Sequence, residues 1–374
     1  MAEKIKKRKG ETRPWADLHE DLLRTIIQKL CLYDRVHSIL VCKEWQAKIL
    51  TIQPLTSSRL PWWMFQYNWR KSFQNNSQKL TLDGMLFNPD SRKLYPVKKD
   101  NWKSKDMSLV FQARPCASEQ GWLLFFKGLR KNGTSFFFYN PFSNDFMLLP
   151  SLSSCTGYVR AAFSRIPTSP DCVVFIAYHV NQELHIGTYT FGEKNWRTQV
   201  VAQAGDIVKS IVYSSEKGEV YCVFWGGKLA KFDVVSRCWS LVKERSLYHL
   251  ASNKQILIEY KGQLLLFSIH DIQLGYIYRF DWSLMDWIAL DSLGGGAIFI
   301  DFSQSLSIAV EEASGWEDNI VYKTYGNSRY YYSSYSLKTR QSCDLSEYYG
   351  YEPKQGTYCG TTWIQPQMQG KLKN

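Results

Sequence analysis

A repeated pattern of aromatic residues constrains the fold of this chain more than any other feature. In four places an aromatic residue ends an apolar run, an Asn or Asp follows it, and a second apolar residue comes seven positions later. A shorter and a degenerate copy extend the series, whose starting aromatic residues are Phe87, Tyr139, Phe191, Phe232, Phe280 and Tyr335. Successive starts lie 41 to 55 residues apart, which is the spacing of blades in a β-propeller.

Each unit has room for four short strands. The Asn or Asp is suited to a hairpin turn, and the paired aromatic residues are suited to packing against the next blade. The pattern predicts an all-β propeller over residues 83–366 with six blades, or seven if the preceding segment supplies one. An array of sandwiches is the alternative, but radial closure removes the exposed edges that so many strands would leave. Residues 361–364 can close the ring by pairing with an early strand.

The N-terminal part has a different period. Residues 15–50 predict a small all-α domain of three short helices, with Asp17 capping the first and Asp34 the second. In the first helix Leu22, Leu23, Ile26, Ile27 and Leu30 follow a helical spacing. Helices this short bury too little apolar surface to be stable alone, so their remaining apolar face needs a partner. That partner is either the rest of the chain or another protein.

The same residues resemble the F-box family. In that family a Leu-Pro pair precedes a Leu-Leu-x-x-Ile helix, an acidic residue opens the next helix, and Val-Cys-Lys-x-Trp closes the motif. Here the chain has Leu18-His19, then Leu22-Leu23 and Ile26, then Asp34, then Val41-Cys42-Lys43-Glu44-Trp45. His19 departs from the pattern, because proline would fix the start of the helix and present an apolar surface to the adaptor. The departure bears on affinity more than on fold.

The C-terminal part resembles plant F-box proteins that carry a kinase-interacting type of β-propeller. The resemblance rests on residues 121–125 leading to Tyr139-Asn140-Pro141-Phe142, on residues 293–300, on Asn319 to Tyr322, and on Trp363-Ile364. It covers most of residues 80–366. Where members often have a Cys-containing loop, this chain has Gly315-Trp316-Glu317-Asp318, which is therefore its own feature.

These resemblances imply a function. The chain is expected to be the substrate-recognition subunit of a Skp-cullin-F-box ubiquitin ligase, binding the Skp adaptor, and through it cullin, with the F-box and a target protein with the propeller. Such a subunit is not an enzyme and needs no cofactor. The alternatives are an interaction protein outside the ligase, for example a kinase-binding one, and a propeller that binds glycans or nucleic acid.

The resemblance also implies where partners bind. The adaptor face is expected to comprise Leu18, Leu22, Leu23, Ile26, Ile27, Leu30, Val41, Cys42 and Trp45, although some of these must pack within the three helices. Exposed aromatic residues in propeller loops are the expected target contacts, because such side chains often anchor protein interfaces. They are Trp316, Tyr348, Tyr349 and Tyr351.

Three segments flank or join these domains. Residues 1–14 form a basic flexible arm with five Lys or Arg between positions 4 and 9, which can act as a nuclear import signal or simply as a solvated tail. Residues 51–82 read as a connector in which Trp62, Trp63, Phe65 and Trp69 pack as anchors, an aromatic ligand cage being the alternative. Residues 367–374 form a tail.

Composition fits a nuclear or cytoplasmic protein. The nine cysteines are scattered singly, with no CxxC pair, which favours a reducing compartment and buried thiols. There is no apolar leader and no run long enough to cross a bilayer, so no membrane association is expected. The net charge of +12 is uneven, because residues 3–9 of the basic arm supply +4 and the remaining +8 is spread over the rest of the chain.

The sequence offers no catalytic constellation. Only His179 and His185 lie near each other, and they lack a third metal ligand, so no metal site is expected. The Gly294-Gly295-Gly296 run precedes a predicted strand and no Lys-Ser/Thr follows, so it indicates a tight turn and not a phosphate loop. Basic and aromatic residues between Lys323 and Tyr332 permit RNA stacking, but alternation within a strand explains them more simply.

Overall fold

The computed structural model describes residues 15, 18–29, 38, 41–52, 61–74, 77–88, 93–99, 111–129, 133–155, 159–202, 207–244, 250, 252, 254–269, 275–302, 306–310, 319–324, 332–344 and 361–366. Several predicted positions lie outside these ranges, namely the arm 1–14, the tail 367–374, Asp17, Leu30, Asp34, Trp316, Tyr348, Tyr349 and Tyr351. The chain divides into two compact units with the boundary between Ser57 and Ser58.

In the described residues of the first unit the structure defines the helices α1 (Glu20–Lys29) and α3 (Lys43–Ile52). Leu23 and Ile27 of α1 pack against Ile49 of α3, and all three side chains are buried. The spacing of Leu23 and Ile27 puts both on one face of the helix. The middle helix predicted to start at Asp34 falls on residues outside the described ranges, apart from the helical Ser38.

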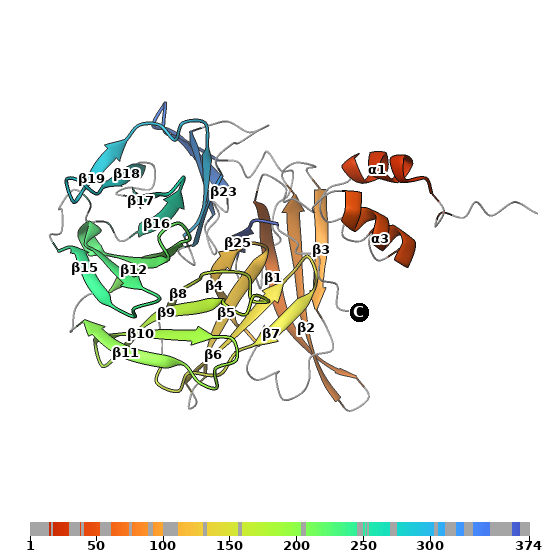
Figure 1. Cartoon of the computed structure of the whole chain (residues 1–374), viewed down its shortest axis with the longest axis horizontal. Helices are drawn as coiled ribbons and strands as arrows, with labels where there is room; N and C mark the ends of the chain where they lie inside the picture. Colours follow the sequence, from red (N-terminus) through yellow and green to blue (C-terminus); the bar gives the residue numbers. More distant parts are fainter. Residues whose placement is uncertain are drawn as a thin grey trace, which may run out of the picture. The chain divides into compact units, whose positions relative to one another are not determined.

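The strands of the second unit form six sheets, which are the blades of a propeller (Figure 1). Blade 1 has β4 (Arg114–Glu119), β5 (Trp122–Leu129), β6 (Gly133–Asn140) and β7 (Asp145–Leu148). Blade 2 has β8 (Val159–Phe163), β9 (Val173–Val180), β10 (Glu183–Thr190) and β11 (Arg197–Ala202). Blade 3 has β12 (Val208–Ser214), β13 (Glu219–Phe224), the short 3₁₀ helix η2 (Trp225–Gly227), β14 (Leu229–Asp233) and β15 (Trp239–Lys243).

The remaining blades complete the ring. Blade 4 has β16 (Lys254–Tyr260), β17 (Gln263–Ile269), β18 (Gly275–Asp281) and β19 (Asp286–Leu290). Blade 5 has β20 (Ala297–Asp301), β21 (Leu306–Val310), β22 (Ile320–Thr324), β23 (Tyr332–Ser336) and β24 (Ser342–Asp344). Blade 6 has β1 (Trp62–Gln74), β2 (Ser77–Asn88), β3 (Lys93–Lys99) and β25 (Thr361–Ile364). The predicted propeller and its six blades are confirmed.

Residues 361–364 close the ring by pairing with an early strand, as the sequence predicts. The innermost strands β4, β8, β12, β16, β21 and β25 contact one another in this order, and β25 contacts β4. Strand β25 is the inner strand of blade 6 and pairs with β1, so that Trp63 stands opposite Trp363. The last strand of the propeller is thereby hydrogen-bonded to its first.

The connector prediction needs a correction. Residues 62–82 do not join two domains but form β1 and the first half of β2 in blade 6. Trp62 is fully buried and its ring lies 5.2 Å from the rings of both Tyr95 and Phe142, so it packs in the core and forms no ligand cage. The side chains of Phe65 and Trp69 are outside the described residues. The outer partner of β1 is the adjacent β2, whereas its inner partner begins only at Thr361, so the local sequence could not reveal how this blade is completed.

The repeated aromatic pairs face each other across hairpins. Tyr139 pairs with Phe146, Phe232 with Trp239, and Phe280 with Trp287. The turns between them share one geometry, in which the side-chain oxygen of Asn140, Asp233 or Asp281 accepts backbone N–H groups two and three residues on. The predicted role of Asn or Asp as the turn residue is therefore confirmed.

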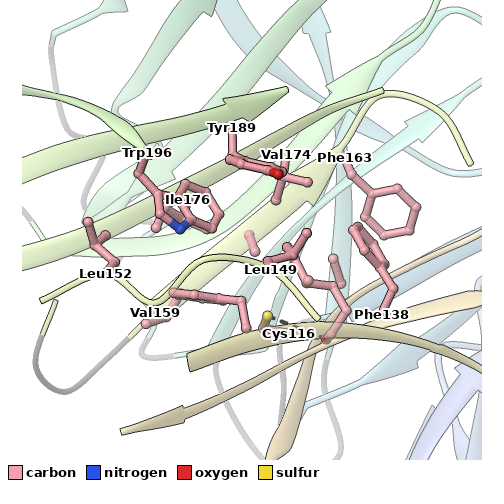
Figure 2. Packing of buried hydrophobic residues seen from close by; sticks show 14 of the residues in the cluster. Cys116, Phe138, Leu149, Leu152, Val159, Phe163, Val174, Ile176, Tyr189 and Trp196 are labelled. Atoms are coloured by element: carbon pink, nitrogen blue, oxygen red, sulfur yellow. Dashed lines mark hydrogen bonds between the residues drawn. The ribbon is translucent and has the colours of Figure 1, made fainter. Parts of the chain in front are cut away.

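The cores between blades are built from aromatic and β-branched residues (Figure 2). Phe138 of blade 1 packs edge-on against Phe163 of blade 2, with ring centroids 5.0 Å apart. Trp196 of blade 2 lies 5.1 Å from Phe136 of blade 1, and its indole N–H donates to the carbonyl of Pro150 over 2.7 Å. Trp196 is the second residue of the predicted pair Phe191–Trp196, so its contact bears out for this pair the predicted packing against the neighbouring blade.

Blade 5 departs from the four-stranded pattern. Strand β20 pairs antiparallel with β21 on its inner side and parallel with β22 on its outer side. The Gly294-Gly295 run turns into β20 with positive φ angles of 63° and 96°, as expected for a tight turn. Asn319 fastens this turn, because its side-chain oxygen accepts the N–H of Leu293 and the hydroxyl of Ser292 over 2.6 and 2.8 Å.

Candidate functional site

The predicted adaptor face divides into buried and exposed residues. Leu23 and Ile27 are buried against Ile49, and Leu18 and Trp45 pack partly buried against this core. Burying these side chains holds the two helices together, since it removes apolar surface from water. These four residues therefore form the interior of the helical unit and present little surface to a partner.

A second set of apolar side chains points to solvent. Leu22 is 58% exposed, Val41 61%, and Ile26 lies at 36%. Leu22 and Ile26 are four residues apart on α1 and share one face. Trp15 is 66% exposed. The adaptor face predicted from the sequence did not include it. An exposed apolar set of this kind on a small unit is typical of an interaction surface.

His19 stands directly before α1 and caps it. Its carbonyl accepts the N–H of Leu23 over 3.0 Å, the first hydrogen bond of the helix, and its ring Nδ1 lies 3.4 Å from the N–H of Asp21. His19 thus occupies the position directly before the helix, because the helix begins at Glu20, and the predicted cap Asp17 lies outside the described residues. The carboxylates of Glu20 and Asp21 in the first turn interact favourably with the positive end of the helix dipole.

Cys42 performs the same task for α3. Its carbonyl accepts the N–H of Gln46 over 3.0 Å, and its Sγ lies 3.4 Å from the N–H of Trp45. Hydrogen bonds from its own backbone N–H and from Cys42 lower the pKa of Glu44, which favours the anion at this helix start. Cys42 is half-buried, so its main contribution is to the helix start.

Two side chains of α3 reach the segment before α1. The indole N–H of Trp45 donates to the carbonyl of Trp15 over 2.7 Å, and the Nζ of Lys48 donates to the carbonyl of Leu18 over 2.9 Å. Neither bond could be foreseen from the sequence, because the partners are 30 residues apart and the acceptors are backbone atoms. They fix how the chain approaches α1.

The propeller shows no catalytic cluster in the residues that the structure describes. Within them no group of three or more His, Cys, Asp or Glu side chains could hold a metal ion. His185 stacks on Tyr178 with ring centroids 5.4 Å apart, and its Nε2 lies 3.6 Å from a Glu183 carboxylate oxygen. Both contacts are those of a histidine packed in a hairpin. No described helix is long and apolar enough to span a bilayer.

A small cavity lies between the inner strands of the ring. It measures about 60 Å³ and is lined by residues of β4, β8, β12 and β21 that include Ala117, Ala161 and Glu119. Space of this size suits a few water molecules and no larger ligand.

The predicted target contacts Trp316, Tyr348, Tyr349 and Tyr351 lie outside the described residues. Among described propeller residues, Trp225 and Trp282 are the partly exposed tryptophans of the turns, at 45% and 37%. The Nζ of Lys217 lies 3.6 Å from the centroid of the Trp282 ring, which is a cation–π contact.

Comparison with known proteins matches both units. The F-box domain matches residues 15–55, and the KIB1-4 beta-propeller matches residues 86–349. The helical unit and the propeller define the class of plant F-box proteins that act as substrate adaptors. Because the second match covers well over half of the sequence, the chain belongs to the KIB1-4 beta-propeller family.

Curated relatives agree with this assignment. The chain is 27% identical over 313 residues to the F-box protein At3g56470 of Arabidopsis thaliana, which covers 81% of this chain and 77% of the relative. It is also 27% identical to the F-box/kelch-repeat protein At1g57790 of the same plant, over 78% of both chains.

Proposed function

We propose that this chain is the substrate-recognition subunit of a Skp-cullin-F-box ubiquitin ligase. Its helical unit binds the Skp adaptor and its propeller binds a target protein, which brings the target close to the ubiquitin-transferring subunits. Proximity is then its whole contribution to the reaction, and no catalytic group of its own is needed. The exposure of Leu22, Ile26 and Val41 beside a core made by Leu23 and Ile27 carries this proposal.

The burial pattern decides which residues to change. Replacing Leu23 by alanine removes a fully buried side chain, at a cost of about 2–5 kcal/mol, so lost binding could simply mean an unfolded helical unit. Leu22 and Ile26 are exposed, and alanine favours a helix at both positions. The double variant Leu22→Ala/Ile26→Ala therefore removes the surface and leaves the core.

The test is adaptor binding by the full-length chain, measured by calorimetry. We expect Leu22→Ala/Ile26→Ala to weaken binding at least about tenfold, since each exposed anchor that becomes buried at an interface contributes on the order of 1 kcal/mol or more. Lys43→Ala, at an exposed polar position of α3, is the matched control and should bind like the wild type. Equal affinity of the double variant and the wild type excludes this surface as the docking site.

Proximity labelling in plant cells extends the test to the target. The wild-type chain should label adaptor, cullin and target, whereas Leu22→Ala/Ile26→Ala should keep the target and lose the other two. For target contacts we retain the proposal that propeller loops bind the target through Trp316, Tyr348, Tyr349 and Tyr351. In the sequence, Trp316 is followed directly by the polar residues Glu317 and Asp318. Loss of all labels together would mean that the variant is misfolded or that one surface binds everything.

A further inference from the structure

Side chains of α3 bind the backbone of the segment before α1. Trp15 and Leu18 offer their carbonyls to two donors of α3, the indole of Trp45 at 2.7 Å and the ammonium of Lys48 at 2.9 Å. The carbonyl of Trp15 also accepts the N–H of Leu18 over 3.4 Å. The backbone of this segment is thus bonded to α3 at two points on either side of a turn.

We call the hydrogen bonds from Trp45 and Lys48 to the carbonyls of Trp15 and Leu18 the clamp. Its geometry follows from helix and turn periodicity. Trp45 and Lys48 are three residues apart on α3 and project from the same face. Their acceptors, at positions 15 and 18, are also three residues apart, so the segment is held along that face. The bond from Lys48 is charge-assisted, which makes it stronger than a bond between neutral groups. Lys48 and Trp45 are half-buried, where such a bond is less weakened by water.

The clamp lies where the surface residues need a fixed backbone. Trp15 and Leu22 are exposed on either side of the Leu18-His19 junction, so the orientation of one relative to the other depends on the backbone at this junction. A proline at position 19 would restrict φ there, and histidine does not. Restricting this freedom before binding lowers the entropy that binding must overcome.

We propose that Lys48 and Trp45 are positioning residues for adaptor docking. They hold the backbone at Trp15 and Leu18 on α3, so that Trp15 and Leu22 meet the adaptor in one arrangement, and they supply the restraint that the residue at position 19 lacks. This inference rests on the proposed function, because it concerns the same docking surface. It adds Trp15 to that surface and assigns Lys48 a role that the F-box pattern does not include.

The first test removes one donor. Lys48→Met keeps the aliphatic stem that packs on the helix and deletes the ammonium group. In the full-length chain we expect adaptor affinity to fall about tenfold, as for the loss of one charge-assisted hydrogen bond. Lys48→Arg keeps a donor and should retain most of the affinity, and Lys43→Met makes the same chemical change at an exposed position of α3 and should have no effect.

The second test distinguishes positioning from general stability. His19→Pro restricts the same backbone by a different means, and the N–H of His19 donates no hydrogen bond among the described residues. In the Lys48→Met background we expect His19→Pro to restore affinity at least about threefold, whereas in the wild type it should change affinity less than that, because the clamp already acts. Equal effects of His19→Pro in both backgrounds would overturn the proposal.

The clamp also has a readout that does not need the adaptor. Hydrogen exchange at the amides of Leu18 and Leu23 should become faster in Lys48→Met and return toward the wild-type rate in His19→Pro/Lys48→Met. If the wild-type chain fails to bind the adaptor while these rates change as expected, the proposed function is wrong and the clamp stands. If the wild type binds and Lys48→Met binds equally well with unchanged exchange, the clamp is wrong and the proposed function stands.

Discussion

Lys323 in β22 is a lysine almost completely removed from water, with 2% of its surface exposed. Its Nζ donates to the hydroxyl of Ser342 over 3.1 Å and lies 5.4 Å from the centroid of the Tyr335 ring. Burial, and then the nearby charge of Lys254, lowers the pKa of Lys323 to about 8. In the unfolded chain its pKa has the ordinary value of 10.5, so the protonated form is destabilised only by folding.

The consequence is a dependence of stability on pH. Between about pH 8 and 10.5 the unfolded chain holds the proton and the folded chain has released it, so the free energy of unfolding rises with pH in this window. Below pH 8 both states are protonated and the penalty is complete, amounting to at most about 3 kcal/mol. Lys323→Met should therefore stabilise the propeller at pH 7 by about 1–3 kcal/mol and by less at pH 9.5.

Urea unfolding of the wild type and Lys323→Met at pH 7 and 9.5 measures this effect. Lys194→Met, at an exposed position, serves as the control and should leave both midpoints unchanged. A midpoint for Lys323→Met that equals or falls below the wild-type midpoint at pH 7 contradicts the prediction.

Single residues also mark a limit of sequence reading. The apolar spacing of α1 places Leu22, Leu23, Ile26 and Ile27 in one broad stripe, and the sequence predicts the stripe correctly. It does not say which half of the stripe is covered, because that depends on where α3 packs. The structure gives Leu23 and Ile27 to the core and leaves Leu22 and Ile26 in solvent.

Among the elements, the hairpin turns of blades 1, 3 and 4 form a recurring unit. An Asn or Asp oxygen accepts two backbone N–H groups, and the fourth residue after it has a positive φ, 60° at Asn144, 58° at Arg237 and 51° at Met285. Blade 1 uses Asn140 where blade 4 uses Asp281, so an amide and a carboxylate support the same turn. The repeat is thus one of hydrogen-bonding geometry and not of residue identity.

Removing the acceptor tests this unit. Asp281→Ala deprives the N–H groups of Ser283 and Leu284 of their side-chain acceptor. It should lower the melting midpoint of the propeller by a few degrees. Asp281→Asn is the matched control, since it keeps the acceptor as blade 1 does. Calorimetric melting of the three proteins at pH 7 decides, and equal midpoints for Asp281→Ala and the wild type would show that the turn holds without the side chain.

The stability that the Asp281 carboxylate contributes depends on pH. Hydrogen bonds from the Ser283 hydroxyl and from the backbone N–H groups of Leu284 and Ser283 lower the pKa of Asp281 below its ordinary value of 3.8. The stability that the carboxylate adds is therefore present above that value and is lost as pH falls through the lowered pKa. Any advantage of the wild type over Asp281→Asn should disappear as the pH falls through this lowered pKa.

The elements that the sequence predicts well are the hairpins that carry the repeated aromatic pair. Hairpin partners such as Tyr139 and Phe146 lie seven residues apart, so one window contains the strand, its turn and its partner. Blade 5 is the counter-example, because the parallel pairing of β20 with β22 joins strands that are separated in sequence by β21. The hydrogen bonds that fasten it, such as those to Asn319, cross the same distance.

At the scale of the whole molecule, the ring depends on one short strand. Residues 62–82 were predicted as a connector because the repeated aromatic pattern starts only at Phe87, and the inner partner of β1, strand β25, lies at the other end of the chain. Trp363 of β25 is buried, with its ring 4.9 Å from Phe299 of blade 5 and 6.2 Å from Trp63 of blade 6. Ser118 of blade 1 adds a hydrogen bond to the carbonyl of Trp363 over 2.8 Å. Three neighbouring blades therefore meet at this strand.

Deleting the closing strand should open the propeller. Truncation after residue 360 removes β25, leaves the inner edge of β1 unpaired, and uncovers apolar surface on blades 5 and 6. We expect a strongly lowered melting midpoint, binding of a hydrophobic dye and association at micromolar concentration. Truncation after residue 366 keeps β25 and should melt like the full chain. Within the intact ring, Trp363→Ala should cost about 3–5 kcal/mol, because a fully packed indole leaves a cavity between blades 5 and 6. Equal melting of the two truncated chains would mean that blade 6 holds its place without the C-terminal strand, and closure would then have to come from contacts between the outer strands.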